Sequence, residues 1–223
     1  MVSTPLDKWV KNRKFEQPVT FVQVGSNDGV SAGGILGVSS DPLYPYVKEK
    51  GWEGIFIEPV QYMFERLQNT YNDTPGLRFL NIAISNEFTE REIWRVKEDA
   101  LPHLPWFADK ISTFHKSIIY DELAQSVDVD SILVSDRVSC VPLWHVFETY
   151  LPNEKIDLLQ IDAEGHDAII LKSSNIPVYR PEFVMLEHKH LKKTEIEEVV
   201  ALLDYAGYSI EFGENDIFAS TVQ

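Results

Sequence analysis

Residues 21–29 read Phe21-Val22-Gln23-Val24-Gly25-Ser26-Asn27-Asp28-Gly29, an apolar run that ends in a loop with two glycines. A short run of this kind predicts a buried β-strand. The two glycines allow a tight turn and let the backbone approach another group closely. A strand that runs into such a loop is typical of the first strand of a doubly wound α/β sheet, in which ligands bind where the strands end.

The same pattern recurs along the chain. Further strands are expected at 54–57, 77–84, 156–161 and 183–186, and helices at 43–50, 60–71, 143–150, 164–171 and 194–206. Asp41 and Thr194 are the expected caps of the first and last of these helices. Residues 208–212 and 216–219 predict a closing hairpin. Near-continuous apolar strands alternating with helices predict a doubly wound, mostly parallel (Rossmann-like) sheet with a C-terminal antiparallel hairpin.

The composition fits one soluble domain over residues 1–223, with 44% hydrophobic and 25% charged residues. Residues 97–136 break the alternation of strands and helices. They hold aromatic side chains at Trp106, Phe107 and Phe114. We expect an insertion over one edge of the sheet, acting either as a lid or only as a structural elaboration.

The net charge of −15 limits the partners that the chain can have. An acidic surface repels nucleic-acid backbones and anionic membranes, so neither is an expected partner. Residues 1–14 lack the apolar core of a signal peptide, and no run approaches the roughly 20 residues of a membrane span. Cys140 is the only cysteine and is expected in the core. We expect a cytoplasmic protein.

Glu58 ends the second expected strand, where a carboxylate can accept hydrogen bonds from both ribose hydroxyls of a nucleoside. The loop after the first strand lacks the G-x-G-x-x-G pattern of dinucleotide sites, and Asp28 within it would repel a pyrophosphate. A cationic nucleoside without phosphates suits this loop better.

Four segments together resemble the FkbM-type methyltransferases, from about Phe21 to His190. They are the glycine loop, Glu58-Pro59, residues 157–165 with the I-D-x-E-G block, and residues 181–188. The resemblance implies a class I fold that binds S-adenosylmethionine and methylates an oxygen of a sugar or natural product. It places the methionine end of the cofactor against Gly25, Ser26, Asn27 and Gly29, the ribose at Glu58 and Pro59, the adenine near Ala83 and Ile84, and Asp162 beside the cofactor. Such enzymes usually carry an acidic residue where this chain has Gln23, and Asp28 is the expected substitute.

Two ways of activating an acceptor hydroxyl remain open, because acidic and histidine residues follow two neighbouring strands. In one, His166 or His190 is the general base, with Asp162 beside it. In the other, Asp162, Glu187 and His188 bind a divalent cation such as Mg²⁺, a pattern similar to the catechol-type O-methyltransferases. A third interpretation leaves these charges paired or solvated.

Two other functions also remain open. The chain could be a non-catalytic nucleoside-binding module, or an NAD-type oxidoreductase on a related fold. The expected partner of the enzyme is a small-molecule acceptor, on which the aromatic residues of 97–136 could stack. The sequence makes no prediction of the oligomeric state or of the role of residues 30–40.

Overall fold

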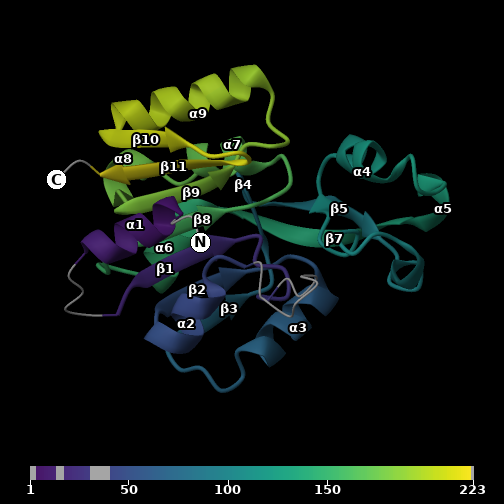
Figure 1. Cartoon of the computed structure of the whole chain (residues 1–223), viewed down its shortest axis with the longest axis horizontal. Coiled ribbons are helices and arrows are strands. Elements are labelled where there is room, and N and C mark those ends of the chain that lie inside the picture. Colours follow the sequence, from purple (N-terminus) through teal and green to yellow (C-terminus); the bar gives the residue numbers. More distant parts are fainter. Residues whose placement is uncertain (1–3, 14–17, 31–40, 222–223) are drawn as a thin grey trace.

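The body of the protein is a seven-stranded sheet with helices on both faces (Figure 1). The computed structural model describes residues 4–13, 18–30 and 41–221, so most of the 30–40 segment lies outside the described residues. The strand order is β10-β11-β9-β8-β1-β2-β3, and only β11 runs antiparallel to its neighbours. The strands are β1 (Thr20–Val24), β2 (Glu53–Ile57), β3 (Leu77–Leu80), β8 (Leu158–Ile161), β9 (Phe183–Glu187), β10 (Tyr208–Phe212) and β11 (Asp216–Thr221). The predicted sheet and its terminal hairpin are confirmed.

Each central strand is apolar on both sides because helices cover both faces of the sheet. Val22 and Val24 pack into one core, while Phe21 packs into the other. The Val22 face is covered by α6 (Leu143–Tyr150), α7 (Asp167–Lys172), α8 (Ile176–Tyr179) and α9 (Lys193–Tyr205). The opposite face is covered by α1 (Pro5–Asn12), α2 (Tyr44–Lys50) and α3 (Gln61–Thr70).

A second, four-stranded sheet carries an arm that extends from the body (Figure 1). Its order is β4-β7-β5-β6, from β4 (Ala83–Ser85), β5 (Thr89–Val96), β6 (Ser112–Thr113) and β7 (Leu133–Pro142). The expected insertion at 97–136 lies largely between β5 and β7. It contains the short helix η1 (Leu101–His103), α4 (Lys116–Leu123) and α5 (Val129–Ile132), with a small core that includes Ile119 and Leu123.

Three local expectations need correction. The strand expected over 77–84 is divided between two sheets, because the Asn81 side chain donates to the backbone oxygens of Glu58 and Pro59 and the chain leaves β2 there. The helix expected at 43–50 begins at Tyr44. Asp41 is not its N-cap, although its carboxylate accepts the Tyr44 N–H at 2.9 Å. The last helix begins at Lys193, so Thr194 lies inside it.

The strand order reverses between β1 and β8. The chain leaves β1 toward α2 on one face and leaves β8 toward α7 on the other. Such a switch point leaves a crevice at the carboxyl ends of the strands, where ligands bind in doubly wound sheets. Within the described residues, no helix has the length and apolar character of a membrane span.

Candidate active site

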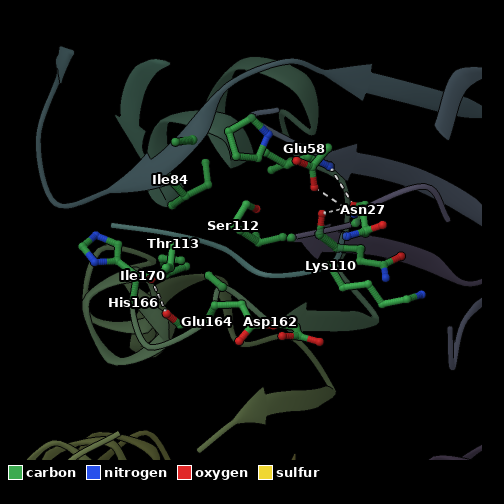
Figure 2. A pocket seen from close by; sticks show the side chains of 18 of the residues that line it. Asn27, Glu58, Ile84, Lys110, Ser112, Thr113, Asp162, Glu164, His166 and Ile170 are labelled. Carbon is green, nitrogen blue, oxygen red and sulfur yellow. Dashed lines mark hydrogen bonds between the residues drawn. The ribbon is translucent and has the colours of Figure 1, made fainter. Parts of the chain in front are cut away.

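A pocket occupies this crevice at the ends of β1, β2 and β8 (Figure 2). The body contributes the loop after β1, the ends of β2 and β8 and the start of β4. The arm contributes residues 106–114, which we call the strap. The predicted site residues that line the pocket are Gly25, Ser26, Asn27, Glu58, Pro59, Ala83, Ile84, Asp162 and His166. Gly29, Glu187, His188 and His190 are not part of its described lining.

The glycine loop is held in place by backbone contacts to neighbouring strands. The N–H groups of Gly25 and Ser26 both donate to the Ile57 carbonyl, at 3.0 and 3.1 Å. Gly25 has a φ of +77°, and a Cβ atom there would lie 1.7 Å from the backbone oxygen of Asp162. Gly29 lies against α3, where a Cβ atom would meet the Tyr71 ring at 2.5 Å. Gly25 therefore shapes the pocket, whereas Gly29 supports the loop from behind.

Glu58 lies buried at the end of β2, only 2% exposed. Its two carboxylate oxygens accept the backbone N–H groups of Asn27 and Val60, at 2.8 and 2.9 Å. These bonds fix the direction of the side chain. Burial raises the pKa of Glu58 to about 7, against the opposing effect of the two N–H donors. The remaining lone pairs of this carboxylate can accept hydrogen bonds from two hydroxyl groups of a ligand.

Asp41 lines the pocket, although the sequence predicted it only as a helix cap. It is 7% exposed, and its Oδ2 atom accepts the side-chain N–H of Gln23 at 2.7 Å. Burial raises the pKa of Asp41 to about 6. Asp28, the acidic residue expected to substitute at Gln23, does not line the pocket. Asp41 instead supplies the acidic group behind Gln23.

The opposite end of the pocket is an apolar slot. Ala83, Ile84, Ile93, Phe114 and Ile170 contribute to its walls. His166 also lies here, 1% exposed, with Nε2 at 3.1 Å from the Ser85 hydroxyl. Burial, then the charge of Arg91, lowers the pKa of His166 to about 3. The imidazole is therefore neutral at physiological pH and a weak proton acceptor.

Acidic groups crowd the ends of β8 and β9. Asp162 lines the pocket, and burial together with the charge of Glu164 raises its pKa well above the usual range. Burial and the charge of Asp162 likewise raise the pKa of Glu187. Among the described residues, the group with metal-ligand spacing is Glu164, Glu187 and His190, whose ligand atoms lie within 4.8 Å of one another.

The predicted cation trio of Asp162, Glu187 and His188 shares only Glu187 with this group. His188 follows Glu187, the last residue of β9, and is not part of that group. The His188 ring lies 5.7 Å from the Phe212 ring on β10, and its backbone N–H donates to the Asn215 carbonyl at 2.7 Å. His190 is the histidine that meets Glu164, with Nε2 at 3.1 Å from its carboxylate.

The strap closes one side of the pocket. Trp106, Lys110, Ser112, Thr113 and Phe114 all line it. The Thr113 hydroxyl donates to the Glu164 backbone oxygen at 2.8 Å, which joins the strap to the loop after β8. Trp106 is 61% exposed and lies in the lining, so its ring is available to a ligand.

The comparisons with known proteins agree with this architecture. The family model of the methyltransferase FkbM domain matches residues 23–210. Among solved structures, the chain is similar to methyltransferase FkbM from Methylobacillus flagellatus KT, with a TM-score of 0.54 and 14% identity over 94% of this chain and 45% of that one. This chain therefore spans about half the length of that protein, and the likeness at this identity shows the fold alone.

Two more distant similarities have TM-scores below 0.5, which is too low to indicate a function. Precorrin-6y C5,15-methyltransferase from Geobacter metallireducens GS-15 gives 0.44 at 8% identity, covering 99% of this chain and 90% of that one. The N-terminal domain of human METTL16 in complex with SAH gives 0.42 at 11% identity, covering 96% and 66%. No curated protein matches the sequence. Because the family model spans most of the chain, the protein belongs to the methyltransferase FkbM domain family.

Proposed function

We propose that the protein is an S-adenosylmethionine-dependent methyltransferase that methylates a hydroxyl group of a small molecule, such as a sugar or a natural product. The observation that carries the proposal is the geometry of Glu58. Its buried carboxylate is aimed by two backbone N–H groups at the edge of the pocket, which is an arrangement suited to a ribose diol. Membership of the methyltransferase family supports the choice of cofactor.

The rest of the pocket fits the cofactor on both sides of the ribose. The apolar slot formed in part by Ala83, Ile84 and Pro59 suits an adenine ring. Asp41 and Asp162 face the other end, where a cationic sulfonium and ammonium would be favoured and a pyrophosphate repelled. This charge pattern disfavours NAD, the cofactor of the rival oxidoreductase hypothesis.

Asp162 is the proposed general base. When bound, the cofactor supplies a methyl group on a positively charged sulfur. Asp162 would accept the proton of the acceptor hydroxyl, which would leave an oxygen lone pair free to take up the methyl group that the cofactor supplies. The raised pKa of Asp162 makes its ionised form a stronger base, and a positively charged ligand bound beside it would favour that ionised form. His166, with a pKa of about 3, is the poorer proton acceptor.

A divalent cation bound by Glu164, Glu187 and His190 is the second candidate for activating the hydroxyl. The spacing of these three residues favours it. Under this hypothesis, EDTA abolishes methyl transfer and Mn²⁺ or Mg²⁺ restores it. Under the Asp162 hypothesis, transfer persists in EDTA.

The strap is the proposed acceptor platform. Trp106 presents an exposed ring in the pocket lining, and such a ring can stack on a sugar face or an aromatic acceptor. The strap also joins the loop after β8 through Thr113, so the arm would act as a lid over the acceptor.

Isothermal titration calorimetry with S-adenosylhomocysteine and with NAD⁺ tests the proposed function. We expect the wild-type protein to bind the first and not the second. Glu58→Ala should weaken S-adenosylhomocysteine binding by at least about tenfold, as expected for lost hydrogen bonds to a charged group. Glu53→Ala, which changes an exposed carboxylate on the same strand, should leave it unchanged. Preference for NAD⁺, or equal affinities in both variants, would overturn the proposal.

A further inference from the structure

Lys110 on the strap is a cation in a pocket that is otherwise acidic. Among the described residues, it is the only lysine or arginine in the lining. The other ionisable residues of the lining are the neutral His166 and four carboxyl groups, Asp41, Glu58, Asp162 and Glu164. Lys110 is half-buried, yet no carboxylate of the described residues lies within 4 Å of its ammonium group. Its charge is therefore available to an anionic group of a ligand.

The strap presents Lys110 together with the exposed ring of Trp106. The ammonium group lies over this ring, 5.6 Å from its centroid. The backbone N–H of Lys110 donates to the Phe107 carbonyl at 3.0 Å, so a turn of the backbone brings the two side chains together. Trp106 is 61% exposed and belongs to the pocket lining. An apolar face with a cation beside it suits a sugar ring that carries an anionic group at its edge.

Lys110 also lies near the place where the proposed reaction occurs. Asp162, the proposed general base, is among the carboxylates that act on Lys110 electrostatically. Figure 2 draws both residues on the side of the pocket away from His166. A ligand stacked on Trp106 can therefore present a hydroxyl group to Asp162 while another group of the same ligand meets Lys110.

The charges around Lys110 favour an anionic group with a single negative charge. One ammonium group balances one carboxylate. A phosphate monoester carries roughly −1.5 to −2 charges at pH 7, so an excess of negative charge would face Asp41 and Asp162. The net charge of −15 further disfavours polyanionic acceptors. Among sugars, a single carboxylate is the mark of a uronic acid.

We propose that the methyl acceptor is a uronic acid unit, with its ring on Trp106 and its carboxylate at Lys110. The inference rests on the proposed function and names the class of acceptor within it. The reaction is the one proposed above, in which a ring hydroxyl gains the methyl group and gives its proton to Asp162. The carboxylate of the sugar is unchanged, because it serves only to bind.

Matched pairs of sugars test the inference by calorimetry on the protein saturated with S-adenosylhomocysteine. The pairs are the methyl glycosides of glucose and glucuronic acid, of galactose and galacturonic acid, and of mannose and mannuronic acid. The two members of a pair differ only at carbon 6, which is an alcohol in one and a carboxylate in the other. Methyl glucoside 6-phosphate tests a group of higher charge. All titrations use the same ionic strength.

The variants are Lys110→Met, Lys110→Arg and Trp106→Ala. Lys116→Met is the matched control, because the Lys116 ammonium group also lies over a tryptophan ring of the arm, 3.5 Å from the Trp94 centroid, but outside the pocket lining. Circular dichroism confirms that each variant is folded. Each variant is also titrated with S-adenosylhomocysteine in the absence of sugar.

At least one uronic acid glycoside should bind about tenfold more tightly than its neutral partner, in the wild-type protein and in Lys116→Met alike. Lys110→Met should reduce this preference to less than about twofold without changing the affinity for the neutral sugar. Lys110→Arg should keep most of the preference, because it keeps the charge. Trp106→Ala should weaken both members of the pair by the same factor, and every variant should bind S-adenosylhomocysteine as the wild-type protein does.

Several outcomes would overturn the inference while leaving the proposed function intact. These are binding of S-adenosylhomocysteine without binding of any sugar, tighter binding of the neutral sugars or of the phosphate, and a preference that persists in Lys110→Met. A loss of S-adenosylhomocysteine affinity in Lys110→Met without sugar would assign this lysine to the cofactor instead. Failure of the wild-type protein to bind S-adenosylhomocysteine would refute both the inference and the proposed function.

Discussion

The affinity for S-adenosylhomocysteine should fall as the pH is lowered from 8 to 6, because Glu58 must be ionised to accept both ribose hydroxyls. Burial raises the pKa of Glu58 to about 7. At this pKa, about 90% of the carboxylate is ionised at pH 8 and about 10% at pH 6. The ratio of these fractions predicts an affinity about tenfold weaker at pH 6.

The raised pKa of Glu58 affects the stability of the fold in the opposite direction to ligand binding. A weaker affinity at low pH therefore cannot be attributed to unfolding caused by this group. A carboxyl group whose pKa is higher in the folded state binds more protons there than in the unfolded state. The ordinary pKa of a glutamate side chain is 4.5, and the free energy of unfolding therefore decreases between pH 4.5 and about 7, by about 3 kcal/mol for Glu58. With respect to this group, the ligand-free protein is more stable at pH 6 than at pH 8.

Calorimetry at pH 8, 7 and 6 in buffers of equal ionic strength measures the effect. Glu58→Gln is the decisive variant, because it removes the titration while keeping the size of the side chain. At pH 8, Glu58→Gln should bind S-adenosylhomocysteine more weakly than the wild-type protein does. Between pH 8 and pH 6, the affinity of this variant should change by less than about twofold. Asp41, whose pKa is about 6, accounts for any residual change at the acid end. The same tenfold fall in the variant, or a constant affinity in the wild-type protein, would refute the role of Glu58.

Three further perturbations probe the proposed base, the glycine loop and the arm. Asp162→Asn should lower kcat for a hydroxyl acceptor by about 10²-fold or more, and a wild-type rate would place the base elsewhere. Gly25→Ala should lower the free energy of unfolding in urea by at least about 2 kcal/mol, because its Cβ atom would lie 1.7 Å from the Asp162 backbone oxygen, and an unchanged midpoint would contradict this close approach. Residues 97–136 should exchange amide hydrogens more slowly with cofactor and acceptor bound, and no change would count against the lid.

The parallel sheet was predictable from sequence because its strands are buried on both faces. Nearly continuous apolar runs such as residues 21–24, in which only Gln23 is polar, leave little choice of structure. The strand β5 was not predicted, for the complementary reason. β5 carries Glu90, Arg91 and Glu92 and is buried mainly at Ile93 and Val96, so its sequence lacks a clear strand pattern.

The position of a residue in the pocket was predictable where the residue directly follows a strand, as for Glu58 and Asp162. Contacts between residues that lie far apart in the sequence could not be predicted from it. Asp41 stands 18 residues from Gln23 in the sequence, and the hydrogen bond between them forms only in the folded chain. Lys110 reaches the pocket through an insertion whose path no local pattern determines. Glu187 and His188 are neighbours in the sequence and suggested a shared cation site, but the group with metal-ligand spacing contains Glu187 and not His188.

A crystal structure of the protein with S-adenosylhomocysteine would show whether Glu58 holds the ribose of the cofactor. We expect both ribose hydroxyls at about 2.6–3.0 Å from the Glu58 carboxylate, with the adenine ring in the slot beside Ile84. Clear density for the ligand with its ribose away from Glu58 would contradict this binding mode, as would an empty pocket in crystals grown at saturating ligand.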